Sequence, residues 1–282
     1  MKKNFSSLMT SVSIPVCLFL LLLVASPASA LLFDDDLPRE TKLRNLNILT
    51  TGAILTWGAI HWDYFQKSPK TGTEGWFEHD SAEGGADKMG HLYSTYAFSH
   101  IYATLYRSWD YPEEQAMRLG AYSSLGVMTI MEIGDSFSSK YGFSYEDMVM
   151  NCIGAAAGYW FGTHPEWQKR LDLRLEYAPS LSNFESDVGT DYEHQKYLLA
   201  LKADGFDKLH DTPLSYLELH LGYYARGYDD YRSYLVDDDR KRSVYVGLGL
   251  NVGKLVKNVW DTPIFNYLQI PYTYVPLEHD LD

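Results

Sequence analysis

The sequence predicts an α+β fold, in which a helical domain of about four main helices is followed by a smaller antiparallel β region. Apolar residues recur with the period of a helix up to about residue 162, and after Pro179 they alternate with the two-residue period of strands. Ahead of both regions stands an apolar run of the kind that directs export. We therefore divide the chain into a signal peptide at residues 1–30, a helical domain at 31–170 and a strand-rich region at 171–282.

The first residues have the pattern of a cleaved secretory signal. Lys2 and Lys3 form the charged end, an apolar run covers residues 14–25, and the Ala-Ser-Ala of residues 28–30 matches the small-residue cleavage pattern. The run is shorter than the roughly 20 apolar residues that a membrane span needs. Cys17 lies inside the run rather than just after it, so the pattern does not indicate a lipid-modified cysteine. The sequence therefore predicts an exported protein.

Four segments of the helical domain have helical periodicity. The third begins at Pro112, which suits the first position of a helix, with Glu113 and Glu114 at its positive end. Ser144 is expected to cap the fourth, with Asp147 three residues on, close to a capping box. Short connections favour antiparallel neighbours. The expected helices are residues 41–65, 86–107, 112–135 and 145–162.

The strand-rich region contains three clear strands and two weaker ones. In the last clear strand, Val244, Val246 and Leu248 face one way, while Tyr245 and Gly247 face the other. Two settings remain open for these strands, a soluble sheet or an outer-membrane location. The clear strands are residues 196–203, 214–224 and 243–252, and the weaker ones are 171–177 and 267–275.

Composition and charge exclude several functional classes. The formal net charge is −13, from 24 Lys and Arg against 37 Asp and Glu, which argues against nucleic acid as a partner because phosphate binding depends on basic residues. The 23 tyrosines suit a surface that is apolar at one end and wet at the other. Cys152 is the only cysteine after the signal, so no internal disulfide is expected, and its apolar neighbours predict a small buried residue.

Three pairs of polar residues share helix faces among apolar or small neighbours. Spacings of three or four residues place both members of each pair on one face. Burying a carboxylate costs several kcal/mol unless it is paired or bound to metal, so we expect the pairs to meet in one polar centre. Antiparallel helices would bring the relevant helix ends together. The pairs are Asp87 with His91, Glu132 with Asp135, and Asp147 with Asn151.

This polar centre has several interpretations, which the sequence leaves open. It is a catalytic centre if His91 acts as a general base oriented by Asp87 or Glu132, with Asp135 alongside. It is a divalent-metal site if the imidazole and the carboxylates bind one ion, although no tight metal-binding spacing is present. It is an anion-binding site if Lys88 recruits a phosphate, with Asp147 and Asn151 as further ligand-binding residues. It is structural if the same groups only form a buried network of ion pairs.

Part of the helical domain resembles a known family. Residues 74–77 (Glu-Gly-Trp-Phe), residues 84–91 (Gly-Gly-Ala-Asp-Lys-Met-Gly-His), Tyr93 and Tyr96 resemble the YfiM-like family of bacterial envelope proteins, whose domain is uncharacterised. The order of Asp87-Lys88-x-x-His91, Glu132, Phe143-Ser144, Asp147, Asn151 and Gly154 is more distantly similar to VanZ-like membrane proteins, which are associated with glycopeptide-antibiotic resistance. The resemblance covers roughly residues 70–162 and implies a bacterial envelope location without an established reaction.

These observations predict an exported bacterial envelope protein of unknown activity, in the periplasm or the outer membrane. Its polar centre is expected to bind an anionic envelope ligand, and its partner is expected to be a membrane or envelope component. One alternative is a metal- or acid/base-dependent hydrolase of envelope lipid or cell-wall material. The other is an assembly protein whose polar centre only fixes the register of the helices.

Overall fold

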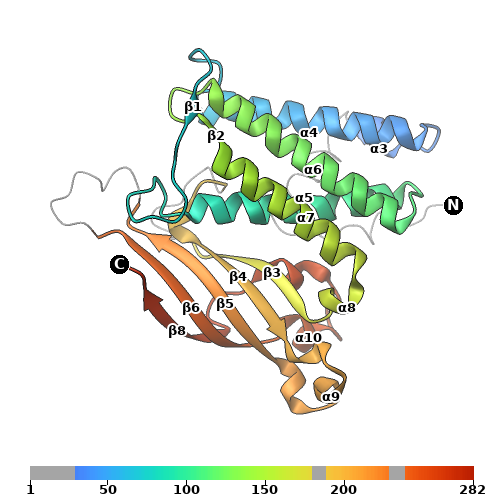
Figure 1. The fold of residues 1–282 in the computed structure, drawn as a ribbon. Helices are drawn as coiled ribbons and strands as arrows, with labels where there is room; N and C mark the ends of the chain where they lie inside the picture. Colours follow the sequence, from blue (N-terminus) through green and yellow to red (C-terminus); the bar gives the residue numbers. More distant parts are fainter. Residues whose placement is uncertain (1–28, 180–188, 229–238) are drawn as a thin grey trace. The chain divides into compact units, whose positions relative to one another are not determined.

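The computed structural model describes residues 29–179, 189–228 and 239–282 (Figure 1). Residues 1–28 of the expected signal peptide lie outside this part of the chain. The α+β prediction is confirmed: four long helices are followed by a six-stranded, mostly antiparallel sheet. Within the described residues the chain forms two compact units. We call residues 29–74 and 94–163 the helical unit, and residues 75–93 together with those from 164 onward the sheet unit.

The four predicted helices are present. The first ends at His61 rather than at Phe65, because Asp63 and Phe65 adopt positive φ angles of 55° and 65° that an α-helix cannot contain. A short helix, α3 (Ser29–Phe33), precedes them, and strand β1 (Thr71–Gly72) pairs in parallel with β2 (Phe143–Ser144). The long helices are α4 (Arg39–His61), α5 (Ala86–Ser108), α6 (Glu113–Ser136) and α7 (Tyr145–Thr163).

Small residues allow three of these helices to pack closely. A Cβ atom on Gly120 of α6 would lie 2.4 Å from the Ser99 carbonyl oxygen of α5, and one on Gly158 of α7 would lie 2.7 Å from Ser99 Cβ. The expectation that Cys152 is buried is wrong: it is exposed on α7, because the buried face of this helix is formed by Asn151, Gly154 and its neighbours. No helix among the described residues is both long and apolar enough to cross a membrane.

The sheet unit is built on six strands in the order β7-β3-β4-β5-β6-β8. All neighbours are antiparallel except β3 and β7, which are parallel. Three short helices connect or precede strands: α8 (Pro165–Gln168), α9 (Asp207–His210) and α10 (Val252–Val256). The strands are β3 (Leu171–Tyr177), β4 (Gln195–Lys202), β5 (Leu217–Arg226), β6 (Lys241–Leu250), β7 (Leu268–Gln269) and β8 (Tyr274–Asp280).

Residues 75–93 form one compact unit with the strands. The Tyr223 hydroxyl donates a hydrogen bond to the Gly84 carbonyl, and the Tyr228 hydroxyl donates to the His79 carbonyl at 2.9 Å. Ala86 packs against Ala225 and Tyr228 in a small buried cluster. The sequence places this segment in the helical domain by its position in the chain, whereas its contacts group it with the sheet.

Along β5, the sheet is polar on its buried face and aliphatic on its exposed face. In β5, Glu218 and His220 are 1% and 0% exposed, whereas Leu219 and Leu221 are 48% and 58% exposed. The same inversion occurs in β6, where Tyr245 is buried and Leu248 is exposed. Strand periodicity predicts the two faces correctly but does not say which one is covered.

Candidate functional site

The helical unit buries carboxylates where α6 ends and α7 begins. Glu132 is 1% exposed, Asp147 3% and Glu146 0%, while Asp135 is half-buried. The connection from α6 to α7 is short, so the end of one helix lies beside the start of the other. The predicted meeting of the Glu132 pair with the Asp147 pair is therefore observed.

Ser144 organises these carboxylates. Its hydroxyl accepts the Asp147 amide at 3.2 Å, which confirms the predicted helix cap. The same hydroxyl donates to Glu146 Oε2 at 3.2 Å, and the Ser144 amide donates to Glu132 Oε2 at 3.2 Å. Ser144 is itself held in place because β2 pairs with β1 in the register Gly72 to Ser144.

Two carboxylates, those of Glu132 and Glu74, each approach Asp147. A carboxylate oxygen of Glu132 lies within 4.8 Å of one of Asp147, and Glu74 likewise brings an oxygen within 4.8 Å of Asp147. Glu74 follows β1, so the pairing of β1 with β2 carries it to the start of α7. Buried Glu146 Oε1 has no hydrogen-bond partner among the described residues. Such oxygens at these separations are the ligand type that hard divalent cations prefer.

The local electrostatics of this carboxylate centre are strongly unfavourable to negative charge. Burial raises the pKa of Glu132 to about 9, and the charges of Asp147 and Asp135 act in the same direction. The amide of Ser144 opposes this effect but does not cancel it. Burial also raises the pKa of Asp135 to about 7, against a hydrogen bond from Tyr64 that lowers it. The centre therefore holds protons near neutral pH unless a cation replaces them.

Tyr64 is wedged between two helices beside this centre. A Cβ atom on Gly58 of α4 or on Gly134 of α6 would lie 2.2 Å from Tyr64 Cε2, so only glycine leaves room for the ring at either position. The Tyr64 hydroxyl donates to the Met131 carbonyl at 2.9 Å. Burial, followed by the charge of Asp135, raises the pKa of this phenol.

Asn151 lies one helical turn beyond Asp147 and joins a buried hydrogen-bond chain. Thr95 Oγ1 of α5 donates to Asn151 Oδ1 at 2.8 Å, and Ser124 of α6 donates to the Thr95 carbonyl at 2.8 Å. Three helices of the unit are thereby joined through polar groups. Asn151 therefore has a clear structural role here.

Three predicted site residues lie in the sheet unit, at the beginning of α5. Lys88 is 1% exposed and forms an ion pair with Asp87, which offsets the charge expected to attract an anion. His91 is half-buried one turn further along. Helix α5 continues unbroken into the helical unit, and its period places His91 on the same face as Thr95. Participation of His91 in the centre stays a prediction.

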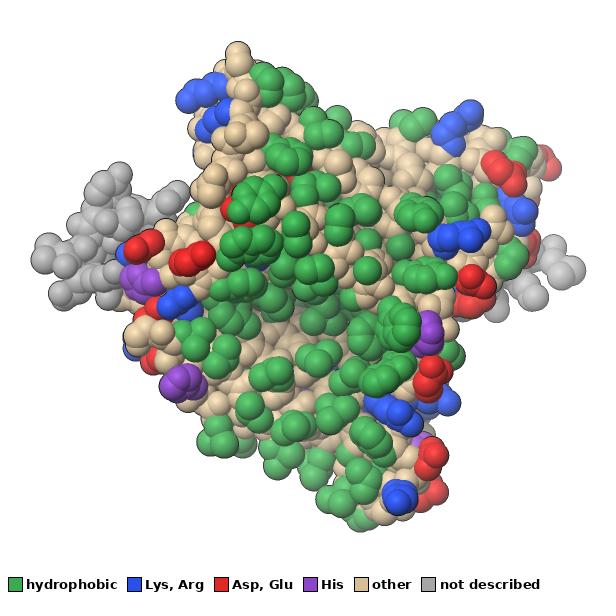
Figure 2. Space-filling model, in the orientation of Figure 1, with side chains coloured by type: hydrophobic (Ala, Val, Ile, Leu, Met, Phe, Trp, Pro, Cys, Tyr) green, Lys and Arg blue, Asp and Glu red, His purple; other side chains and the backbone are tan. Residues whose placement is uncertain are grey.

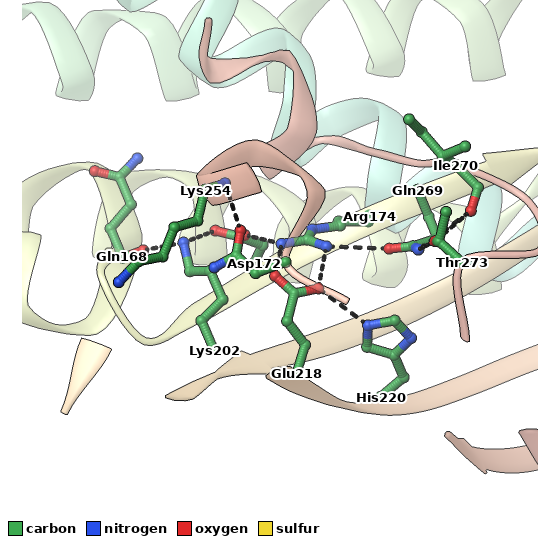
Figure 3. A network of polar contacts seen from close by, with 11 residues as sticks. Gln168, Asp172, Arg174, Lys202, Glu218, His220, Lys254, Gln269, Ile270 and Thr273 are labelled. Carbon is green, nitrogen blue, oxygen red and sulfur yellow. Dashed lines mark hydrogen bonds and ion pairs between the residues drawn. The ribbon is translucent and has the colours of Figure 1, made fainter. Parts of the chain in front are cut away.

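A second polar cluster, which the sequence analysis did not identify, fills the buried face of the sheet (Figure 3). Arg174 donates to Glu218 at 2.7 Å and to Asp172 at 2.6 Å, and Lys202 donates to Asp172 at 2.7 Å. His220 lies 3.1 Å from Glu218. Two cations thus face two carboxylates, as expected of a balanced structural network.

The pKa of Glu218 reflects this pairing. Burial alone would raise it, but the hydrogen bonds from His220 and Arg174 and the guanidinium charge hold the pKa of Glu218 below its usual range. The sheet network therefore differs in kind from the carboxylate centre, where pKa values are raised. Its signal in the sequence is the alternation of charged residues along β3 and β5, at Asp172 and Arg174 and at Glu218 and His220.

One comparison identifies a related segment. Residues 73–163 match the model of a family described as "Predicted periplasmic lipoprotein (DUF2279)". The matched residues include every position of the predicted polar centre, from Asp87 to Asn151. No curated protein and no solved structure matches the chain. The match supports an exported protein of the bacterial envelope, associated with the periplasm, whose biochemical function is unknown.

Proposed function

We propose that the protein is an envelope protein whose helical unit binds a divalent metal cation through Glu74, Glu132 and Asp147. The observation that carries this proposal is that Asp147 has one carboxylate oxygen within 4.8 Å of an oxygen of Glu132, and one within 4.8 Å of an oxygen of Glu74. Carboxylates held this close repel one another, and a cation between them would remove that repulsion. Glu146 Oε1 provides a further buried acceptor nearby.

The sign of the charge favours a cation over an anionic ligand. Beyond the effect of burial, the charges of Asp147 and Asp135 help to raise the pKa of Glu132, and the charge of Asp147 helps to raise the pKa of Asp135. These negative charges would repel a phosphate. Oxygen ligands favour hard ions such as Mg²⁺, Ca²⁺ or Mn²⁺.

Calorimetric titration of the chelator-treated protein with Mn²⁺, Ca²⁺ and Mg²⁺ tests this proposal. We expect one ion to bind per chain in the wild type, with binding abolished by Glu132→Gln and by Asp147→Asn. Glu114→Gln, an exposed position on the same helix α6, is the matched control and should bind as the wild type does. Binding should also release protons at neutral pH, because Glu132 must lose its proton to act as a ligand.

The alternative functions give distinct results in the same experiment. An assembly protein with a structural centre would bind none of the three ions, while both variants would lower the melting temperature. An acid/base hydrolase that needs no metal would also bind none, and its activity on envelope lipid or cell-wall material would survive chelation. Either result, obtained with a folded wild-type protein, would refute the cation site.

A further inference from the structure

The exposed face of the sheet carries an ordered group of aliphatic side chains. They come from the neighbouring strands β5, β6 and β8 and form two rows across the sheet, with exposed fractions from 47% at Val246 to 78% at Leu277. Hydrophobic side chains gather over the strands in Figure 2. We call this group the aliphatic patch. Its rows are Leu221, Val246 and Leu277, and Leu219, Leu248 and Val275.

The patch faces outward because the other face of the same strands is committed to the buried polar network. Glu218 and His220 alternate with Leu219 and Leu221 along β5, so turning the patch inward would expose the network and unpair Arg174. Burying the leucines of β5 would therefore cost the ion pairs of the polar network, so the leucines lie on the exposed face. Exposed leucine and valine in such an array mark a surface for an apolar partner.

We propose that the aliphatic patch inserts into one leaflet of a lipid bilayer. The patch contains only leucine and valine. Protein interfaces draw most of their binding energy from tryptophan, tyrosine and arginine anchors, with leucine and valine under-represented. Acyl chains have no polar groups to satisfy and need no such anchors. The composition of the patch therefore fits lipid better than protein.

The size of the patch fits one leaflet. With the third row that Leu217 and Leu250 add, it extends about 14 Å along the strands and about 14 Å across three of them. The hydrocarbon core of a bilayer is about 30 Å thick, so this length matches roughly half of it.

Aromatic side chains mark one end of the patch. Tyr216 directly precedes β5 and is 41% exposed, and its carbonyl accepts the Asn251 amide at 2.8 Å. Tyr272 is 95% exposed, and the next residue, Thr273, accepts the amide of Leu250 at 3.0 Å. Both tyrosines therefore lie at the Leu250 end of the strands. Tyrosine at the end of an aliphatic surface is typical of the boundary between acyl chains and headgroups.

The charge of the protein indicates which lipid headgroups the patch would meet. The patch has no ionisable side chain, and the chain as a whole carries −13. Net negative charge disfavours a surface of anionic lipids. Neutral zwitterionic lipid is thus the expected surface, and binding should depend on apolar burial and only weakly on salt.

Flotation of the processed protein with phosphatidylcholine vesicles tests the proposal. We expect the wild type to float with the vesicles and the triple variant Leu219→Thr, Leu248→Thr, Leu277→Thr to remain at the bottom. Threonine keeps the strand preference of these exposed positions, so circular dichroism should show an unchanged fold. The control variant Ile48→Gln, Ile133→Gln, Ile153→Gln removes three exposed aliphatic residues from the helical unit and should float as the wild type does.

Three results would overturn the proposal. The first is flotation of the patch variant to the wild-type extent, and the second is an equal loss of flotation in the control variant. The third is a dimer, measured by analytical ultracentrifugation without vesicles, that the patch variant abolishes, since this would assign the patch to self-association. Stronger flotation on adding phosphatidylglycerol would contradict the choice of neutral lipid.

Discussion

Glu132 is the residue on which the account of the carboxylate centre depends most. It is 1% exposed, and burial together with neighbouring carboxylates raises its pKa to about 9, against 4.5 for the free side chain. A group with a raised pKa in the folded state binds its proton more tightly there than in the unfolded chain. The stability that it contributes is present below about pH 4.5 and is lost as pH rises through about 9.

We therefore expect the metal-free protein to melt at a lower temperature at pH 9 than at pH 6. Glu132→Gln, which has no proton to lose, should show a smaller decrease over this range. Differential scanning calorimetry in chelator at both pH values measures the effect. A wild-type decrease no larger than that of the variant would show that Glu132 is not held protonated by its surroundings.

The two glycines against Tyr64 provide a test of packing at the same scale. Gly134→Ala would place a Cβ atom 2.2 Å from the Tyr64 ring, and relieving this overlap should cost about 1–3 kcal/mol. On the same helix, a Cβ atom on Gly126 meets nothing within 4 Å, so Gly126→Ala should stabilise by about 0.5–1 kcal/mol. Urea unfolding measures the change in the free energy of unfolding for each variant. Equal changes at both positions would contradict the tight packing of Tyr64 against Gly134.

Residue-level reasoning from the sequence identified Glu132, Asp135 and Asp147, because helical spacing marks polar groups on apolar faces. It did not identify Tyr64 or Glu74 as partners. Both lie outside the long helices, and the turns and the β1–β2 pairing that place them depend on contacts far apart in the sequence. Spacing within a helix carries no information about such positions.

At the scale of elements, the starts of α6 and α7 follow from local signals. The cap at Ser144 and the acidic start of α6 are both present where the sequence indicates them. The orientation of the sheet does not follow, because period-two alternation is the same whichever face is covered. Here the covered face is the polar one, since its charges pair with one another and need no water.

The sheet network yields a prediction about the stability of the strands. Arg174→Met would leave two buried carboxylates, Asp172 and Glu218, without their shared guanidinium, and should destabilise the protein by about 3–5 kcal/mol. Lys169→Met, at an exposed position just before β3, should change stability by less than about 0.5 kcal/mol. Chemical denaturation followed by circular dichroism measures both. Similar midpoints for the two variants would contradict a structural role for the network.

At the scale of the whole molecule, the chain combines two polar interiors of opposite character. The network around Arg174 in the sheet unit pairs its carboxylates with cations, whereas the helical unit concentrates carboxylates with raised pKa values. A balanced network needs nothing from outside, while an unbalanced one favours a proton or a cation. We therefore propose the cation site in the helical unit. In the sheet unit, the proposed contact is the one between lipid and the aliphatic patch on its exposed face.

The central claim is that the carboxylate centre binds a divalent cation, and elemental analysis of the processed protein, purified without chelator, tests it most directly. We expect a stoichiometric divalent metal in the wild type and in Glu114→Gln, and none in Glu132→Gln. A folded wild-type protein that contains no metal, and that takes up none when dialysed against Mn²⁺ or Ca²⁺, would contradict the claim.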